Sequence, residues 1–159
     1  LVKGSSGGTM LKTDLADTQI PPHSNGRCIT PEQVCDLIQR HADHSKLFHQ
    51  TGAVHSAALC TPEQILFYAE DIGRHNALDK LAGHILLEQV DVSDKIATIS
   101  CRMSLEIVGK IIQTGIRTVI SNAAPTLGAI QLAADSGLTL IGFARGDRFN
   151  IYSHGNRVC

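Results

Sequence analysis

The chain has 159 residues, of which 43% are hydrophobic and 18% charged, enough apolar content to fill the core of one compact domain. Fourteen basic residues against fifteen acidic ones give a net charge of -1, which excludes binding to nucleic acid or to an anionic membrane through overall charge. Apolar runs are far shorter than the roughly 20 residues of a membrane span, and no signal sequence opens the chain, so we expect a soluble, cytoplasmic protein.

Residues 1–29 are predicted to form a flexible lead-in loop to a single α/β domain over residues 30–159. Glycine, serine and proline recur in the lead-in without a sustained helical or strand period. The chain starts at Leu1 instead of methionine, which suggests a fragment of a longer product.

A helix is predicted to begin after Thr30 and to run to about Phe48. Thr30 supplies a capping hydroxyl, Pro31 suits the first turn, and Gln33 stands where a capping box has its amide. Apolar residues then recur at helical spacing. The other face of this helix is expected to be solvated, and it carries Arg40, His41, Asp43 and His44.

Strands and helices alternate along the rest of the chain. Residues 54–60 and 64–69 are extended runs joined by a short turn, which predicts a hairpin. Helices between strands predict crossover connections, and therefore a mixed but largely parallel sheet covered by helices. The remaining predicted elements are helices at 76–89, at 104–113 and from Pro125, and strands at 95–100, 117–121, 138–144 and 150–153.

Basic residues follow three of the predicted strands. Arg74 comes after the hairpin, Arg102 after the next strand, and Arg145 and Arg148 after the last buried strand. A cation at a helix N-terminus opposes the helix dipole by about 0.3–1 kcal/mol, so a cluster of cations there favours a bound anion. In open α/β sheets, ligands bind at the carboxyl ends of the strands, where backbone N–H groups favour phosphate. The sequence therefore predicts a phosphate-bearing ligand; the alternative is a set of solvated arginines.

Two segments carry most of this expectation. In residues 71–80, DIGRHNALDK, we expect Asp71 to accept hydrogen bonds from the edge of a guanine base, and Arg74 and Lys80 to bind a diphosphate. His75 is expected to donate to the ligand, and Asn76 to cap the helix. The alternative makes Asn76 an ordinary cap and Asp79 with Lys80 an exposed ion pair. In residues 142–147, GFARGD, small residues let a ligand approach the backbone beside Arg145.

Cysteine and histidine do not form a recognisable metal or redox pattern. His55, Cys60 and Cys101 lack ligand spacing, so no metal site is expected, and no residue is assigned a catalytic role. The cysteines are expected to be reduced, because their number is odd and they lack a CxxC pair; they are Cys28, Cys35, Cys60, Cys101 and Cys159.

Five ordered blocks distinguish the region from residue 51 onward. They are TGAVHSAAL (51–59), EDIGRHNALDK (70–80), SCRMSLEIV (100–108), SNAAPT (121–126) and GLTLIGFARGDRFNIYSH (137–154). Together they resemble the formate dehydrogenase accessory family, FdhD/NarQ, and GRHNALDK is the most diagnostic part. Family members carry a further N-terminal region, so this chain resembles their C-terminal domain.

The resemblance implies a three-layer α/β/α fold like that of cytidine deaminase, a homodimer and a role as sulfur carrier. Such a protein takes sulfur from a cysteine desulfurase as a persulfide. It binds the molybdenum bis(molybdopterin guanine dinucleotide) cofactor as its client and sulfurates it before insertion into formate dehydrogenase. The cofactor contacts that the resemblance places are Phe143, Ala144, Arg145, Gly146, Asp147 and Arg148, with Asp71, Arg74, His75, Asn76, Lys80, Ser100 and Arg102.

The chain departs from the family at the sulfur-carrying loop. Members usually have Ser-Cys-Gly-x-Cys-Gly there, whereas residues 4–8 read GSSGG without a cysteine. Either another thiol such as Cys28 carries sulfur, or the protein is a chaperone that binds the cofactor without sulfur transfer; whether it is a sulfurtransferase enzyme stays open. A zinc deaminase-like hydrolase is a third alternative, but His55 lacks the following x-Glu and the chain lacks a Pro-Cys pair.

Overall fold

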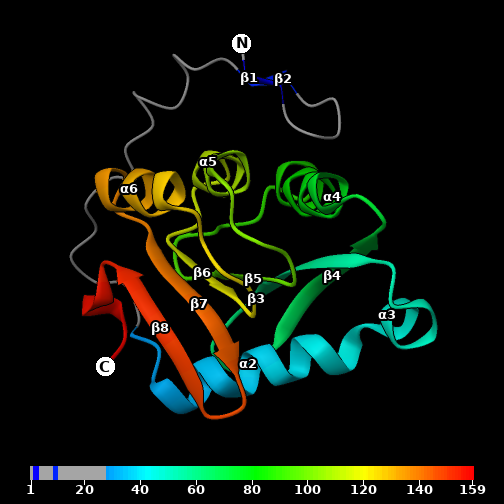
Figure 1. Cartoon of the computed structure of the whole chain (residues 1–159), viewed down its shortest axis with the longest axis horizontal. Coiled ribbons are helices and arrows are strands. Elements are labelled where there is room, and N and C mark those ends of the chain that lie inside the picture. The colour runs from blue at the N-terminus through cyan, green and yellow to red at the C-terminus, as the bar shows by residue number, and fades with distance from the viewer. Residues whose placement is uncertain (1, 4–8, 11–27) are drawn as a thin grey trace.

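The computed structural model describes residues 2–3, 9–10 and 28–159 (Figure 1). The first four of these form a short antiparallel pair, β1 (Val2–Lys3) with β2 (Thr9–Met10). The predicted lead-in loop otherwise lies mostly outside the described residues.

A six-stranded mixed sheet forms the centre of the molecule, with strand order β4-β3-β5-β6-β7-β8. The pairs β5–β6 and β6–β7 are parallel, and the other three pairs are antiparallel. The expected mixed sheet is confirmed, but its parallel part is smaller than predicted because a hairpin closes each end. The strands are β3 (His55–Cys60), β4 (Ile65–Asp71), β5 (Ile96–Ile99), β6 (Thr118–Ser121), β7 (Thr139–Arg145) and β8 (Arg148–Ser153).

Helices cover both faces of the sheet, which gives the predicted three-layer α/β/α arrangement (Figure 1). Helices α4, α5 and α6 lie on one face and α2 on the other. Buried side chains fill both interfaces, with Leu81, Ile107 and Ile111 in the first core and Val34 and Leu37 in the second. The helices are α2 (Pro31–His44), α3 (Lys46–Thr51), α4 (Arg74–Leu87), α5 (Leu105–Gln113), α6 (Leu127–Asp135) and the short 3-10 helix η1 (Gly155–Arg157).

Helix α2 begins at the predicted capping box. Thr30 Oγ1 accepts the N–H of Gln33 at 3.3 Å, and Gln33 Oε1 accepts the N–H of Thr30 at 2.9 Å. The helix is shorter than predicted, because the chain bends at Ser45 and continues as α3. Ser45 Oγ donates a 2.6 Å hydrogen bond to Glu70 at the end of β4, which fixes the bend.

His41 lies in the core, so the expectation that it is solvated is wrong. Its ring nitrogens lie 2.7 Å from Thr98 Oγ1 and 2.7 Å from Ser56 Oγ, and the residue is 2% exposed. The side chain extends the apolar stripe of Val34, Leu37 and Ile38 by one helical turn, which explains its burial. Burial lowers the pKa of His41 from 6.5 to about 4, so the ring is neutral in the folded protein at pH 7.

The burial of His41 predicts a loss of stability on mild acidification. Between pH 6.5 and pH 4 the unfolded chain binds a proton on this ring and the folded chain does not, so the free energy of unfolding falls as the pH falls. We expect a loss of about 2 kcal/mol between pH 7 and pH 5 from this residue, measured by urea unfolding at both pH values.

The variant His41→Gln keeps a hydrogen-bonding side chain but cannot titrate, and its loss between the same pH values should be clearly smaller. His49→Gln, at an exposed position of α3, is the control. An equal pH dependence in His41→Gln and the unmodified protein would contradict this account.

Candidate functional site

Four strands end at one edge of the sheet, which we call the carboxyl edge. Because β3 is antiparallel to both β4 and β5, strand β4 runs in the same direction as β5, β6 and β7. The start of β3 joins them, with His55 paired to Asp71. The predicted meeting of the cation-bearing strand ends at one edge is therefore confirmed.

The carboxylate of Asp71 organises the loop between β4 and α4. It accepts the N–H of Gly73 at 2.9 Å and Nδ2 of Asn76 at 3.1 Å, and Nζ of Lys80 lies 2.8 Å from its second oxygen. Lys80, then Gly73 and Asn76, lower the pKa of Asp71 to about 2. Lys80 also donates to the carbonyl of Glu70 at 2.8 Å. Three predicted ligand residues are thus bonded to one another, and they shape this loop.

The first turn of α4 differs from the predicted one. Gly73 is the N-cap residue, so the expectation that Asn76 caps the helix is wrong; its amide reaches back to Asp71 instead. His75 is 3% exposed, and burial, followed by the charge of Lys110, lowers its pKa. Its ring therefore lies behind the surface that a ligand would reach.

Arg74 and Arg102 give the carboxyl edge positive charge beside His55. The pKa of His55 is lowered by partial burial first and then by these two guanidinium groups. Because both cations act on one imidazole, the ends of β4 and β5 bring them to the same part of the edge. Their charge and the N-terminus of α4 together favour an anion there.

Strand β7 bends at Phe143, next to the loop after β6. Phe143 has φ +52°, a left-handed conformation that costs a non-glycine residue on the order of 1 kcal/mol or more. Its N–H donates to the carbonyl of Ala123 at 3.1 Å. A Cβ on Gly142 would lie 3.1 Å from that same oxygen and 3.1 Å from Pro125 Cδ, so a larger residue would force its neighbours to shift by a few tenths of an ångström.

The predicted contacts that follow Phe143 divide into buried and accessible groups. Ala144 is 1% exposed and packs in the core beneath α2, so its side chain is closed to a ligand. Arg145 donates from Nε to the carbonyl of Asn122 at 2.9 Å, which places it across the end of β6.

The turn between β7 and β8 is open to solvent. Gly146 has φ +58°, and Arg145 pairs with Arg148 across the turn. The side chains of Arg148 and Asp147 are 92% and 96% exposed and lie 3.8 Å apart, too loosely to hold each other. This turn can therefore meet a large ligand at the carboxyl edge without rearrangement of a core.

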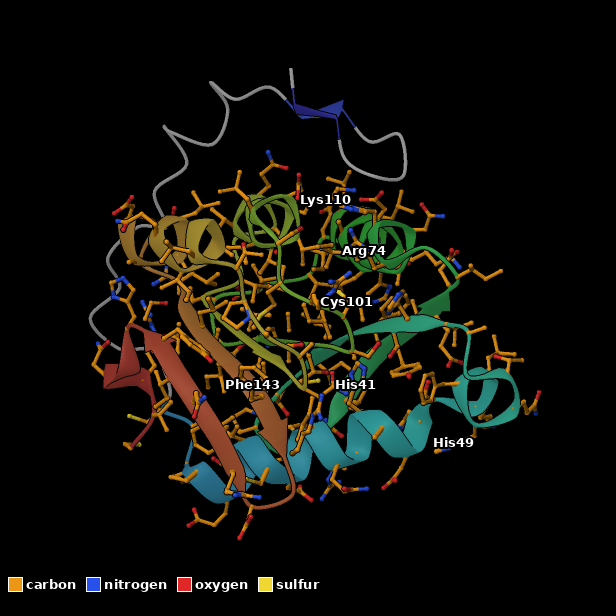
Figure 2. The ribbon with its side chains drawn as sticks, in the orientation of Figure 1. His41, His49, Arg74, Cys101, Lys110 and Phe143 are labelled. Carbon is orange, nitrogen blue, oxygen red and sulfur yellow. The ribbon has the colours of Figure 1, made fainter. Side chains whose placement is uncertain are left out.

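A pocket of about 330 Å³ opens at the carboxyl edge on the side of α2. Among the predicted site residues, Ser100 lines it; its Oγ accepts the N–H of Ser56 at 2.8 Å, and Ser56 Oγ in turn contacts His41. Figure 2 shows His41 on the side of the sheet that α2 covers. The volume is at the lower end of small-molecule sites, about 300–1,000 Å³. The lining residues are Ile38, His41, Ala42, Ser45, Phe48, His49, Gly52, Ala53, Val54, His55, Ser56, Ser100 and Asn122.

Most of these lining residues were not predicted from the sequence. The wall made by α3 depends on the bend at Ser45, which no local pattern indicates. The burial of His41 could have been found, because its position continues the apolar stripe of α2. Asn122 borders both the pocket and Arg145, so this arginine adjoins the pocket.

Four of the five cysteines are either buried or distant from this region, whereas Cys35 in α2 is half-buried; burial, followed by the charge of Asp147, raises its pKa. Burial raises the pKa of Cys60 to about 11 and that of Cys101 to about 11, so both thiols stay protonated at pH 7. Cys28 and Cys159 are exposed, and a hydrogen bond with Cys28 raises the pKa of Cys159. They flank a bridge in which Cys159 N–H donates to the carbonyl of Ile29 at 3.1 Å.

That bridge lies at the opposite end of the sheet, where β5 and β6 begin, which we call the amino edge. Ile29 borders the first residues of both strands, Ile96 and Thr118. Even the shortest strands, of four residues, separate the two edges by roughly 13 Å. Cys28 and Cys159 therefore do not belong to the carboxyl edge.

The described part of the chain holds neither a metal-binding cluster nor a membrane-spanning helix. Within it, no three side chains of His, Cys, Asp or Glu come together in a way that could bind a metal ion. No helix in it combines the length and apolar character needed to cross a membrane.

Comparison with known proteins gives consistent results. The model of the FdhD/NarQ family matches residues 2–159. A Bacillus licheniformis protein named sulfur carrier protein FdhD is 48% identical over 84% of this chain and 51% of its own length. Its Bacillus subtilis counterpart is 46% identical over 82% of this chain and 50% of its own length. The chain thus spans about half the length of these curated relatives.

A solved structure shows the same fold. The crystal structure of a proposed formate dehydrogenase accessory protein from Desulfotalea psychrophila superimposes with a TM-score of 0.82 at 28% identity. The match covers 92% of this chain and 62% of that one.

The close approach at Gly142 predicts that a single methyl group is destabilising. Gly142→Ala would press a Cβ against Ala123, Pro125 and Tyr152, and we expect the free energy of unfolding to fall by about 1–3 kcal/mol. Gly83→Ala is the matched control, because a Cβ there meets nothing within 4 Å and should stabilise α4 by up to about 1 kcal/mol. Denaturant unfolding of both variants checks this; equal stability of Gly142→Ala and the unmodified protein would show that the loop yields freely.

Proposed function

The chain belongs to the FdhD/NarQ family, and we propose that it is the part of a sulfur carrier protein that binds the molybdenum bis(molybdopterin guanine dinucleotide) cofactor. The cofactor is here a substrate that the protein holds while sulfur is delivered, before its insertion into formate dehydrogenase. A cysteine desulfurase is the proposed source of that sulfur.

One observation carries the proposal: cations from three strand ends lie at the same edge of the sheet as a pocket, and two residues of the pocket lining, His55 and Asn122, are their neighbours. Arg74 and Arg102 act together on His55, and Arg145 donates to the carbonyl of Asn122; both His55 and Asn122 line the pocket, although no arginine does. Neither Asp71 nor Lys80 is needed as a direct ligand, because each fixes the loop that presents Arg74.

The chemistry of a guanosine diphosphate arm is complementary to this arrangement. A diphosphate gains charge-assisted hydrogen bonds from guanidinium groups, each worth about 1.5–3 kcal/mol. The pocket of about 330 Å³ has room for a nucleoside, and Phe48, His55 and Ser100 offer both apolar and polar contacts to a base. Phe143, 45% exposed in a strained turn, offers a further surface for stacking.

The position of the thiols favours a second candidate, a chaperone that binds the cofactor without carrying sulfur itself. In the described residues, the exposed thiols Cys28 and Cys159 lie at the amino edge, across the sheet from the cations. Cys101 is near Arg74 but buried, and burial raises its pKa. Within one copy of this chain, sulfur on Cys28 would have to travel across the sheet.

A homodimer in the cytoplasm completes the proposal. Leu86 and Leu87 at the end of α4 are 77% and 81% exposed, and they adjoin a groove lined by Ile85 and Lys110. Adjacent exposed leucines of this kind favour contact with a second protein surface, here another copy of the chain.

Guanosine diphosphate binding tests the proposed cofactor site. We expect saturable binding by calorimetry, weakened at least about 10-fold in Arg102→Ala and in Arg145→Ala, because each removes a charge-assisted contact to phosphate. Guanosine without phosphate should bind all three proteins equally.

Arg40→Ala is the matched control. It removes an exposed arginine that pairs with Asp36 on the outer face of α2, so guanosine diphosphate should bind it normally. Absence of saturable binding in the unmodified protein, or an equal loss in Arg40→Ala, would remove the central claim.

Persulfide labelling separates the two candidate functions. In sulfur transfer, the Cys28 thiolate attacks the outer sulfur of the desulfurase persulfide, forms Cys28–S–SH and releases the desulfurase thiolate. After incubation with a desulfurase and cysteine, mass spectrometry should then show 32 Da added to Cys28 and none to Cys60 or Cys101, which are buried. Cys28→Ser removes the label, and Cys35→Ser is the control. An unlabelled protein that still binds guanosine diphosphate would support the chaperone instead.

A further inference from the structure

Arg117 is a buried cation at the amino edge of the sheet that has no side-chain partner among the described residues. The residue is 7% exposed, and its Nε is enclosed without a hydrogen-bond partner. No hydrogen bond or ion pair joins its guanidinium group to any of the described residues. The backbone is fixed, since the carbonyl of Arg117 accepts the N–H of Thr139 at 2.8 Å.

A guanidinium group cannot avoid the free-energy cost of a buried charge by losing its proton. Its pKa is so high that it stays charged in proteins, whereas a buried lysine can become neutral. A buried charge without a counter-charge is strongly destabilising. A negatively charged group next to Arg117 would therefore stabilise the folded protein.

A second arginine, Arg157, adds a further positive charge to the same pocket. Arg157 lines the same pocket and acts electrostatically on Arg117, and burial followed by this charge lowers the pKa of Arg157. One nitrogen of Arg157 is held by the carbonyl of Gly137 at 3.0 Å and by Thr139 Oγ1 at 2.9 Å. These neutral acceptors orient the group but do not balance its charge.

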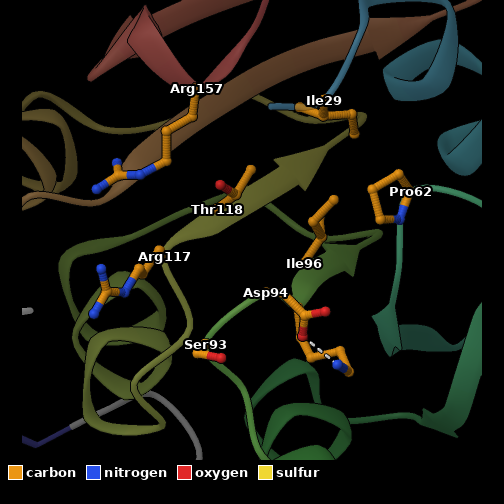
Figure 3. A pocket seen from close by; sticks show the side chains of 9 residues that line it. Ile29, Pro62, Ser93, Asp94, Ile96, Arg117, Thr118 and Arg157 are labelled. Atoms are coloured by element: carbon orange, nitrogen blue, oxygen red, sulfur yellow. Dashed lines mark hydrogen bonds and ion pairs between the residues drawn. The ribbon is translucent and has the colours of Figure 1, made fainter. Parts of the chain in front are cut away.

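The acidic residue in the pocket lining is already paired. Asp94 forms an ion pair with its neighbour Lys95, and both line the pocket with the two arginines (Figure 3). Arg117 and Arg157 extend toward the same side in this view. The described lining thus carries an excess of two positive charges, on Arg117 and Arg157.

The pocket is small and open to solvent. Its volume is about 20 Å³, and one water-sized atom needs about 10–15 Å³. There is room for one or two oxygen atoms of an anion whose remainder stays in solvent. Carboxylate and phosphate oxygens match the planar fork of arginine in this way.

We propose that Arg117 and Arg157 form a binding site for a small oxyanion, at the amino edge and separate from the carboxyl edge. Thr118 and Ser93, which also line the pocket, add hydroxyl donors beside the two guanidinium groups. The site does not depend on the proposed cofactor function, because none of its residues lies at the carboxyl edge.

Thermal unfolding with inorganic phosphate tests the site. The unmodified protein is heated in Tris chloride with increasing phosphate, and sodium chloride keeps the ionic strength constant. We expect the unfolding midpoint to rise saturably by about 2–4 °C, because phosphate binds the folded state alone.

Arg117→Met supplies the decisive comparison. It has a similar length without charge, so the rise with phosphate should disappear. In chloride alone its midpoint should equal or exceed that of the unmodified protein, because a buried charge has been removed. Arg117→Lys keeps a charge but loses the fork, and phosphate should bind it about 10-fold more weakly or less well still.

Two controls separate this site from others. Arg40→Met removes an exposed arginine that pairs with Asp36 on α2, and it should keep the full rise with phosphate. Arg117→Met should bind guanosine diphosphate like the unmodified protein, so failure here and failure of the proposed function are distinguishable.

Three results would overturn the proposal. The first is a midpoint in the unmodified protein that does not depend on phosphate. The second is an undiminished rise in Arg117→Met. The third is an Arg117→Met protein that unfolds several degrees lower in chloride alone, which would mean that a carboxylate of the chain itself already neutralises the arginine.

Discussion

The antiparallel pairing of β3 with both of its neighbours determines where everything else in the structure can act. It turns β4 around so that its end points the same way as those of β5, β6 and β7. With the reverse direction, the Asp71 loop and Arg74 would lie at the amino edge, away from Arg102 and Arg145. The antiparallel strand β3, which lies between β4 and β5, therefore brings cations that are distant in the sequence to one edge.

The two edges of the sheet have different chemistry as a result. The carboxyl edge combines a pocket with the exposed side chains of Arg102 and Arg145, whereas at the amino edge the exposed thiols lie near the buried Arg117 and the half-buried Arg157. This separation bears directly on sulfur transfer. In a family member with its reactive thiols in another loop, the path of sulfur to the carboxyl edge would differ from the path in this chain, whose exposed thiols are Cys28 and Cys159.

Local patterns in the sequence predicted the elements and the cation-bearing strand ends. The capping box at Thr30 and the alternation of strands and helices depend on neighbours within a few residues, so the sequence contains them directly. The pocket could not be predicted in this way, because its walls come from α3, β3 and the ends of β5 and β6. Side-chain partners could not be predicted from the sequence either. Asn76 is a residue type that caps helices, but Gly73 begins the helix. Lys80 has the charge of a phosphate ligand, but it pairs with Asp71. The burial of His41, by contrast, can be read from the sequence, because its position continues the apolar stripe of α2.

Glu70 makes hydrogen bonds to elements on both faces of the sheet. Its carboxylate accepts from Ser45 at the start of α3, and its carbonyl accepts from Lys80, which in turn braces the Asp71 loop. The α3 wall of the pocket and the loop that carries Arg74 are thus both held by hydrogen bonds to one residue, Glu70, on the outer strand β4. Displacement of α3 by an occupant of the pocket would be transmitted through this strand to the opposite layer, so the two halves of the carboxyl edge respond as a unit although no helix connects them.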